Sequence, residues 1–339
     1  MGSRSRVSGL LSGLLNDSSG RRWPLSQRRP WLPLSPMPSA RLTSRERDLY
    51  GEGEEPPRFG ELNKLLPVFL VIVTIVFLYI QYFFLHCLRL LQLDLPDVLR
   101  DTAAQQRASI QLGCFHVVTL LLLYCLLRCL LTFPGTIPDN QGWDLQSEVQ
   151  APVNGEMKSV ELTEKKTTGE RRHCKWCLKY KPDRCHHCRI CNVCVLRMDH
   201  HCPWVYNCIG FRNHKYFILL LIYSAIDLLF IGVTMFESVW WSTRTDVNPS
   251  LMLLMVFAEC FVGFLATVNI LFLGFHGWLT VKAMTTLEFC EKSMKTASYD
   301  SSIYSRGVYD NICAVLGPNP LLWLLPCSLP KGDGLTWKS

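Results

Sequence analysis

Four long apolar stretches, separated by polar segments, dominate the pattern of hydrophobic and polar positions along the chain. They cover residues 65–85, 112–133, 216–236 and 251–279, and the first contains no charged residue. A helix needs roughly 20 apolar residues to cross the hydrocarbon core of a bilayer, and a helix without a polar face does not suit a surface in water. The pattern therefore predicts an α-helical polytopic membrane protein with four transmembrane helices.

Polar segments of different character separate these stretches. Residues 1–64 are rich in Arg, Ser and Pro, which is typical of a disordered tail. Residues 134–172 are expected to be a cytosolic linker, and residues 280–339 a cytosolic C-terminal tail. Because the first apolar stretch begins far behind Met1, we interpret it as a retained signal-anchor helix rather than a cleaved signal peptide. An Arg- and Ser-rich start is also typical of a mitochondrial transit peptide.

The distribution of positive charge predicts the orientation in the membrane. Lys and Arg number 30 in the two terminal segments and the central segment, against 4 in the two remaining loops. Because Lys and Arg concentrate on the cytosolic side, both termini are expected in the cytosol. The expected membrane is that of the Golgi, the endoplasmic reticulum or the plasma membrane. The formal net charge of +7 is too small and too dispersed to indicate a nucleic-acid partner; beside apolar stretches it favours an anionic lipid bilayer.

A small cysteine-rich module is predicted at residues 173–215, between the second and third helices. Eight of the sixteen cysteines and five of the nine histidines lie between residues 173 and 208. The cysteines recur at two-residue spacing: Cys174/Cys177, Cys185/Cys188, Cys188/Cys191 and Cys191/Cys194. Cytosolic thiols stay reduced, which argues against disulfides, whereas such pairs with histidines nearby are typical of zinc sites. Two sites of three cysteines and one histidine each would leave two cysteines outside both.

Catalytic chemistry is indicated by the run Asp199-His200-His201-Cys202. A cysteine becomes a nucleophile when a base removes its proton or a positive charge lowers its pKa. Histidine is that base near neutral pH, and an adjacent carboxylate orients it and stabilises its charged form. By spacing alone, a zinc knuckle that uses every Cys and His explains the same run equally well.

A long composite pattern connects the module to a known family. Residues 174–217 contain Cys-x2-Cys, Lys-Pro-Asp-Arg before His-Cys, Cys-x2-Cys-x2-Cys, Asp-His-His-Cys, Pro-Trp, Asn-Cys-Ile-Gly and Asn213-x3-Phe217. This segment resembles the DHHC cysteine-rich-domain protein S-acyltransferases, or palmitoyltransferases. Residues 285–288 resemble the family's Thr-Thr-x-Glu motif, and Asn311 with Leu316-Gly317 resembles its short C-terminal motif. Phe133 stands where the family often has Asp, and Tyr206 where it often has Asn.

The resemblance implies roles for individual residues. One structural zinc is expected on Cys174, Cys177, His187 and Cys194, and a second on Cys188, Cys191, His201 and Cys208. Cys202 matches the family nucleophile, His200 its base and Asp199 the residue that orients the base. The supporting motif residues are Thr285, Thr286, Glu288 and Asn311. Cys185 is then no ligand, and His186 competes with His187 for the first zinc.

The implied function is membrane-bound protein S-acylation. A palmitoyl group would pass from fatty acyl-CoA to a Cys202 thioester and then to cytosolic cysteines of membrane-associated protein substrates. Nearby basic residues are candidates for binding the phosphates of CoA: Lys179, Lys181, Arg184 and Arg189. A non-catalytic zinc-bearing membrane scaffold or adaptor is the alternative. A channel or transporter is a third, weaker hypothesis prompted by Asp227 and Glu259 inside predicted helices.

Asp227 has two interpretations of its own. A carboxyl group that deep in the third helix is expected to point into the bundle. It then either marks the far end of an acyl cavity and limits chain length, or makes a hydrogen bond to a Ser, Thr or Asn on another helix.

Overall fold

The computed structural model describes residues 62–139, 142–145, 162–166, 168–293, 303–327, 330 and 332–337. Residues 1–61 of the predicted tail (residues 1–64) lie outside the described residues, as do parts of the predicted linker and of the C-terminal segment. The described residues all belong to one compact unit, Glu61–Ser339.

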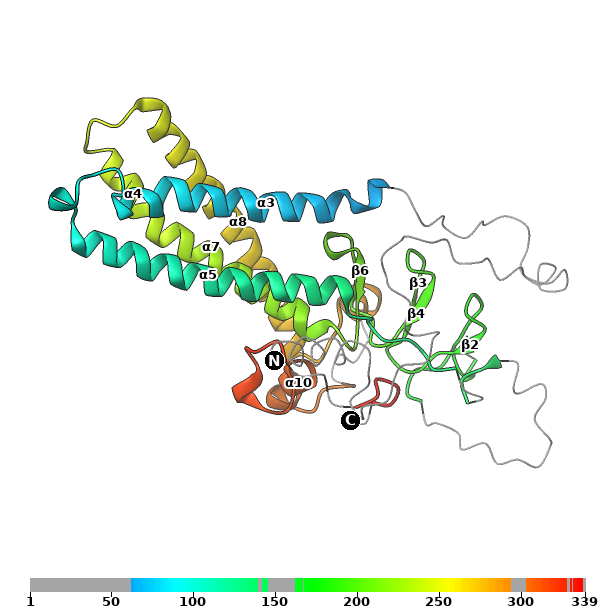
Figure 1. Cartoon of the computed structure of the whole chain (residues 1–339). Coiled ribbons are helices and arrows are strands. Elements are labelled where there is room, and N and C mark those ends of the chain that lie inside the picture. The colour runs from blue at the N-terminus through cyan, green and yellow to red at the C-terminus, as the bar shows by residue number, and fades with distance from the viewer. Residues whose placement is uncertain are drawn as a thin grey trace, which may run out of the picture. The chain divides into compact units, whose positions relative to one another are not determined.

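Four long helices form a bundle, as the apolar pattern predicts (Figure 1). They are α3 (Leu66–Tyr82, continued by a π-helical turn, Phe83–Cys87, and α4, Leu88–Leu91), α5 (Thr102–Leu131), α7 (His214–Ser242) and α8 (Pro249–Val281). Each is long and apolar enough to cross a membrane, with mean hydropathy between 2.2 and 2.6. At most ends they extend beyond the apolar stretches, because flanking residues continue the same helices, whereas α5 ends at Leu131, two residues before the predicted end. The protein is therefore a multi-pass membrane protein.

Local sequence explains where two of the helices begin. The carboxylate of Asp101 accepts a hydrogen bond from the backbone N–H of Ala103 (2.9 Å) at the start of α5. Asn248 does the same for Ser250 (2.9 Å) at the start of α8, where Pro249 occupies the first turn. Such caps satisfy N–H groups that lack partners within the helix.

The core of the bundle is aromatic and aliphatic, and its outer surface is equally apolar. Tyr82, Phe115 and Met235 lie at its centre with at most 1 % of their surface exposed. In contrast, Val233 and Leu271 are 74 % and 70 % exposed. A helix that is apolar on every side matches a hydrocarbon solvent rather than water.

The cysteine-rich module consists of three short antiparallel hairpins at one end of the bundle (Figure 1). They pair β1 (His173–Cys174) with β2 (Lys179–Tyr180), β3 (His186–Cys188) with β4 (Val193–Val195), and β5 (His200–Cys202) with β6 (Asn207–Ile209). Each turn contains one residue with positive φ: Leu178 (52°), Asn192 (51°) and Tyr206 (44°). The left-handed backbone explains the family preference for Asn at the position of Tyr206, because Asn tolerates this region better than an aromatic residue does.

Amide side chains attach the module and the C-terminal helix to the bundle. Asn207 is fully buried and donates to the carbonyls of Cys129 and Thr132 (2.9 Å each) at the end of α5. Asn311, on α10 (Val308–Leu316), donates to the carbonyl of Val281 (2.9 Å) at the end of α8. Both contacts satisfy carbonyl groups that have no partner within their own helix.

Gly210, which closes the Asn-Cys-Ile-Gly sequence, lies where two segments approach closely. A Cβ atom there would lie 2.6 Å from Cγ1 of Val195 and 3.0 Å from the carbonyl oxygen of Leu196. The position therefore needs glycine for space.

Asp227 makes the helix–helix hydrogen bond that was one of its two interpretations. The hydroxyl of Thr119 on α5 donates to both carboxylate oxygens of Asp227, at 3.3 and 3.2 Å. We expect Asp227→Leu to lower thermal stability and to leave the acyl-chain preference unchanged. Thr119→Val should have the same effect, and the double variant should lose little more, since such bonds contribute about 0.6–2 kcal/mol in bilayers. A shift of Asp227→Leu towards longer acyl-CoAs would support the cavity interpretation instead.

Candidate active site and metal sites

Two clusters of three cysteines and one histidine form in the module. In the first, Nδ1 of His187 lies 3.5 Å from the sulfur of Cys174, 3.3 Å from that of Cys177 and 3.9 Å from that of Cys194. In the second, Nδ1 of His201 lies 3.7, 3.4 and 3.6 Å from the sulfurs of three further cysteines: Cys188, Cys191 and Cys208.

The spacing of these atoms fits a tetrahedral metal ion. Zinc bonds of 2.3 Å to sulfur and about 2.05 Å to nitrogen place neighbouring ligand atoms about 3.5 Å apart. Each cluster supplies four donors of the types that zinc prefers, within 4.8 Å of one another. Both clusters are thus able to bind a metal ion, with no position left open for substrate.

The hairpins build each cluster from two sequence elements. A Cys-x-x-Cys turn supplies two sulfurs, and the backbone N–H of Cys191 points at the sulfur of Cys188 (3.3 Å) within one such turn. The next hairpin supplies the other two ligand atoms from residues directly across its ladder. His201 pairs with Cys208 in this way. The strand register therefore gathers the ligands of each cluster, although the ligands of the two clusters alternate along the sequence.

Two cysteines and three histidines of the cysteine-rich run lie outside both clusters. Cys185 is fully buried in a small apolar core. His186 faces Glu291, with Nδ1 and the carboxylate 3.8 Å apart. Cys202 is 95 % buried and belongs to neither group of ligand atoms. The thiol of Cys202 is therefore not needed as a metal ligand.

Asp199 and His200 form a hydrogen-bonded pair beside Cys202. Nδ1 of His200 donates to Oδ2 of Asp199 (2.7 Å). Burial alone would raise the pKa of Asp199, but the bond from His200 and nearby histidine charges hold it well below its usual range. Burial opposes protonation of His200, yet hydrogen bonds to Asp199 and Cys202 raise its pKa to about 9. The pair thus stabilises an imidazolium next to the thiol.

Residues 285–288 complete the surroundings of Asp199. Thr286 donates to Asp199 twice, from its backbone N–H to Oδ1 (3.0 Å) and from its hydroxyl to Oδ2 (2.8 Å). Thr285 and Glu288 form a reciprocal capping box around the short helix α9 (Thr286–Glu288). This box fixes the backbone that presents Thr286 to the carboxylate.

A buried ion pair ties these residues to the module. Nε and Nη2 of Arg184 donate to the two carboxylate oxygens of Glu288, each at 2.7 Å, and Nη2 also donates to the carbonyl of Ala283 (2.7 Å). Burial would lower the pKa of Arg184, but Glu288 raises it above its ordinary value. Arg184 is 98 % buried, so the hypothesis that it binds a CoA phosphate is wrong: its donors are used within the protein.

Cys202 belongs to an apolar cluster to which all four membrane helices contribute. The cluster contains Leu126 of α5 and Leu221 of α7, and Ile75 of α3 and Leu273 of α8 pack against it. Cys202 therefore lies where the cysteine-rich module meets the apolar bundle.

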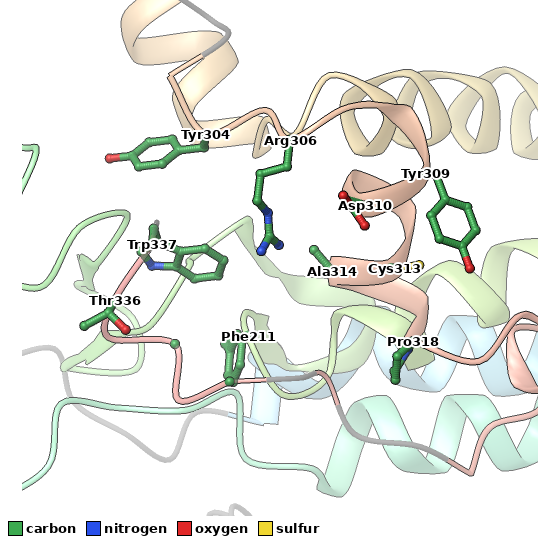
Figure 2. A pocket seen from close by; sticks show the side chains of 12 residues that line it. Phe211, Tyr304, Arg306, Tyr309, Asp310, Cys313, Ala314, Pro318, Thr336 and Trp337 are labelled. Atoms are coloured by element: carbon green, nitrogen blue, oxygen red, sulfur yellow. The ribbon is translucent and has the colours of Figure 1, made fainter. Parts of the chain in front are cut away.

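Two cavities open on the polar part of the molecule. One, of about 390 Å³, is lined on its basic side by Lys175, Lys181 and Arg189, and includes Leu287 next to Thr286. The other, of about 410 Å³, lies between Phe211, α10 and the C-terminal residues, with Arg306 and Trp337 on its wall (Figure 2). Its lining contains no residue of the Asp-His-His-Cys run.

The C-terminal residues 332–337 cover part of the module. The ring of Trp337 packs on Phe211 (centroids 6.0 Å apart) and lies 5.0 Å from the guanidinium of Arg184. At Gly334 the chain adopts φ +75°, and a Cβ atom there would lie 2.9 Å from the Phe211 ring. This contact shields the Arg184–Glu288 pair from one side.

Two histidines near Asp199 were not predicted as site residues. His214 begins α7 and His276 lies near the end of α8, and both are nearly fully buried beside the carboxylate. They are 62 positions apart in the sequence, so spacing gives no signal. A histidine inside an apolar span, as at His276, is the signal available, because ionisable residues there are rare.

Comparison with known proteins agrees with the geometry. The family described as DHHC palmitoyltransferase matches residues 167–293. Palmitoyltransferase ZDHHC15 of Xenopus laevis is 31 % identical over 287 residues, which cover 80 % of this chain and 81 % of that protein. The mouse ZDHHC15 is 32 % identical over 79 % of this chain and 80 % of its own, and palmitoyltransferase ZDHHC2 of Danio rerio is 37 % identical over 53 % and 50 %. The chain belongs to the DHHC family of protein S-palmitoyltransferases.

Proposed function

We propose that Cys202 carries the acyl group in a two-step transfer from fatty acyl-CoA to protein cysteines. The observation that supports this most directly is a buried thiol outside both metal clusters and beside His200, whose imidazole Asp199 orients in turn. Asp199 and Thr286 form the outer part of this arrangement. A scaffold without turnover has no need for such a thiol.

In the first step the proton of Cys202 resides on His200, as a thiolate–imidazolium pair, and the thiolate attacks the carbonyl carbon of the acyl-CoA thioester. The C–S bond to CoA breaks, and the CoA sulfur leaves with the proton from His200. In the second step the thiol of a substrate cysteine gives its proton to His200 and attacks the Cys202 thioester. The acyl group moves to the substrate, and Cys202 is regenerated with its proton. A covalent intermediate of this kind predicts ping-pong kinetics.

The position of Cys202 suits a fatty acyl donor. Keeping a long acyl chain out of water is favourable by about 0.8 kcal/mol per CH2 group. The apolar cluster around Cys202 leads into the bundle between residues of all four membrane helices. We place the acyl chain there and the CoA moiety on the cytosolic side.

Two of the basic residues suggested by the sequence remain candidates for CoA phosphates. Lys181 and Arg189 line the 390 Å³ cavity next to Leu287. Lys179 instead pairs with Asp139. A Lys or Arg that faces such a cavity offers charge-assisted hydrogen bonds to phosphate.

The two Cys/His clusters are assigned structural zinc. Their role is to hold the hairpins, and with them Cys202 and His200, in place. The substrates we propose are membrane-associated proteins with cytosolic cysteines. We further propose that both termini lie in the cytosol, which the charge distribution supports, and that the membrane is that of the Golgi, the endoplasmic reticulum or the plasma membrane.

The proposal is tested with purified enzyme in lipid nanodiscs. The enzyme is incubated with acyl-CoAs of increasing length, and mass spectrometry follows the peptide that contains Cys202. The expected result is an acyl group bound to Cys202 as a thioester and then transferred to a cysteine peptide. Acylation confined to other cysteines would overturn the assignment.

The neighbours His200 and His201 should respond differently to substitution. We expect His200→Ala to slow autoacylation at pH 7 by roughly 10²–10⁴-fold. The rate should recover in part above pH 8.5, where a thiol ionises without a base. In the wild type the imidazolium keeps its proton up to its pKa of about 9, so the rate should vary less with pH.

His201→Ala is the matched control. His201 faces three cysteine sulfurs, so its removal should lower the zinc content, and higher pH should not restore the rate. Equal zinc content and equal pH profiles in the two variants would show that base and ligand roles are not divided in this way.

A further inference from the structure

Asp199 faces two buried histidines that the acyl-transfer mechanism does not use. His214 and His276 are 3 % and 2 % exposed. Nδ1 of His276 lies 3.9 Å from Oδ2 of Asp199, and the three side chains place ligand atoms within 4.8 Å of one another. Among the described residues, neither Nδ1 atom has a hydrogen-bond partner.

Aromatic rings fix His276 in this orientation. Phe217, Phe272 and Phe275 pack edge-on against its imidazole, with ring centroids 4.9, 4.5 and 5.5 Å away. The ring is therefore held with Nδ1 towards the carboxylate. A buried polar atom without a partner costs about 1–3 kcal/mol. Two buried histidines that each have such an atom, gathered around one carboxylate, indicate that a further group binds among them.

We propose that Asp199, His214 and His276 form a third metal site, which binds Zn²⁺ reversibly and inhibits acyl transfer. One carboxylate and two imidazoles are the protein ligands of known zinc sites that keep an open position. The site has no thiolate, unlike the two cysteine clusters. Its affinity should therefore be lower, so that chelators remove this ion and leave the other two.

Inhibition follows from what Asp199 already does. Its Oδ2 accepts the hydrogen bond from His200 and that from the Thr286 hydroxyl. A dication on this carboxylate competes with His200 for the oxygen. It also repels the imidazolium, since the rings of His200 and His276 are only 5.7 Å apart. The inhibitory part of the inference rests on the proposed roles of Asp199 and His200, whereas the binding part does not.

Binding is tested by adding Co²⁺ to enzyme that already holds two zinc ions. Cobalt on nitrogen and oxygen ligands gives visible d–d bands without the near-ultraviolet sulfur-to-cobalt charge-transfer band that a thiolate ligand produces. We expect one further ion per chain with this signature in the wild type and in Cys202→Ser. His276→Gln and His214→Asn should each lose it, with their two zinc ions retained as evidence of folding. No third ion, or a charge-transfer band that Cys202→Ser removes, would overturn the site.

Inhibition is tested by autoacylation at buffered concentrations of free Zn²⁺. A zinc ion on the Cys202 thiolate would also inhibit, so the comparison among histidine variants decides. We expect His276→Gln and His214→Asn to need at least ten times more zinc for half-inhibition than the wild type does. The control is His116→Gln, because His116 lies in membrane helix α5 and bonds to Tyr79 instead; it should behave like the wild type. Equal sensitivity in all variants would overturn the inhibitory role. Cobalt bound without inhibition would instead contradict the role of Asp199 in catalysis.

Discussion

Cys202→Ser should abolish the acyl-enzyme and leave two zinc ions bound per chain. The two results are linked by geometry, because Cys202 belongs to neither group of ligand atoms. Serine keeps the size of the side chain but is a far weaker nucleophile beside a histidine that is adapted to a thiol. Autoacylation should fall to the rate of uncatalysed exchange with acyl-CoA. Mass spectrometry of the Cys202 peptide and metal analysis of the same sample measure both quantities.

Cys191→Ala is the matched comparison for Cys202→Ser. Its sulfur lies 3.4 Å from Nδ1 of His201 and 3.5 Å from the sulfur of Cys208, so it belongs to the second cluster. Its loss should release one zinc ion and unfold the module, since structural zinc contributes folding free energy directly. Full metal content in Cys191→Ala, or fewer than two ions in Cys202→Ser, would mean that nucleophile and ligand have been confused.

The membrane helices and the cysteine-rich module were open to prediction from the sequence because their signals are local. A run such as residues 65–85 is apolar at every position and has one physical explanation at that length. The ligands of each zinc site are harder to predict, because His186 and His187 are neighbours and their distance in sequence from the cysteines does not distinguish them. The ladder decides between them by pairing His187 with Cys194.

Contacts between segments that are distant in the sequence could not be predicted from the sequence. Arg184 was grouped with surface cations because it lies in a basic stretch, yet it pairs with Glu288, 104 positions away. Thr286 was recognised only as part of a motif, and its contact with Asp199 depends on how α8 ends. His214 and His276 meet Asp199 only after α7 and α8 have packed. No periodicity in the sequence predicts this contact, because neither histidine departs from the helical pattern of its own segment.

Glu288→Gln should destabilise the protein and also slow catalysis. The substitution preserves shape but removes the carboxylate to which the buried guanidinium of Arg184 makes its bidentate hydrogen bonds. The two side chains are 1 % and 2 % exposed, and breaking such a pair costs about 3–5 kcal/mol. The same carboxylate accepts a bond from the backbone N–H of Thr285 (2.9 Å). The backbone that presents Thr286 to Asp199 should therefore loosen, and autoacylation should fall although both zinc ions stay bound.

A second substitution separates charge from packing at this position. Arg184→Met combined with Glu288→Gln removes the uncompensated charge, so thermal stability in nanodiscs should recover much of what the single variant loses. Autoacylation should recover with it if Glu288 acts through the position of Thr286. Glu170→Gln is the surface control: its pair with Lys166 (3.0 Å) is exposed to solvent, and the substitution should leave both stability and rate unchanged. If Glu288→Gln is as stable as Glu170→Gln, then the ion pair does not hold residues 285–288 against the module, and other contacts must place Thr286 beside Asp199.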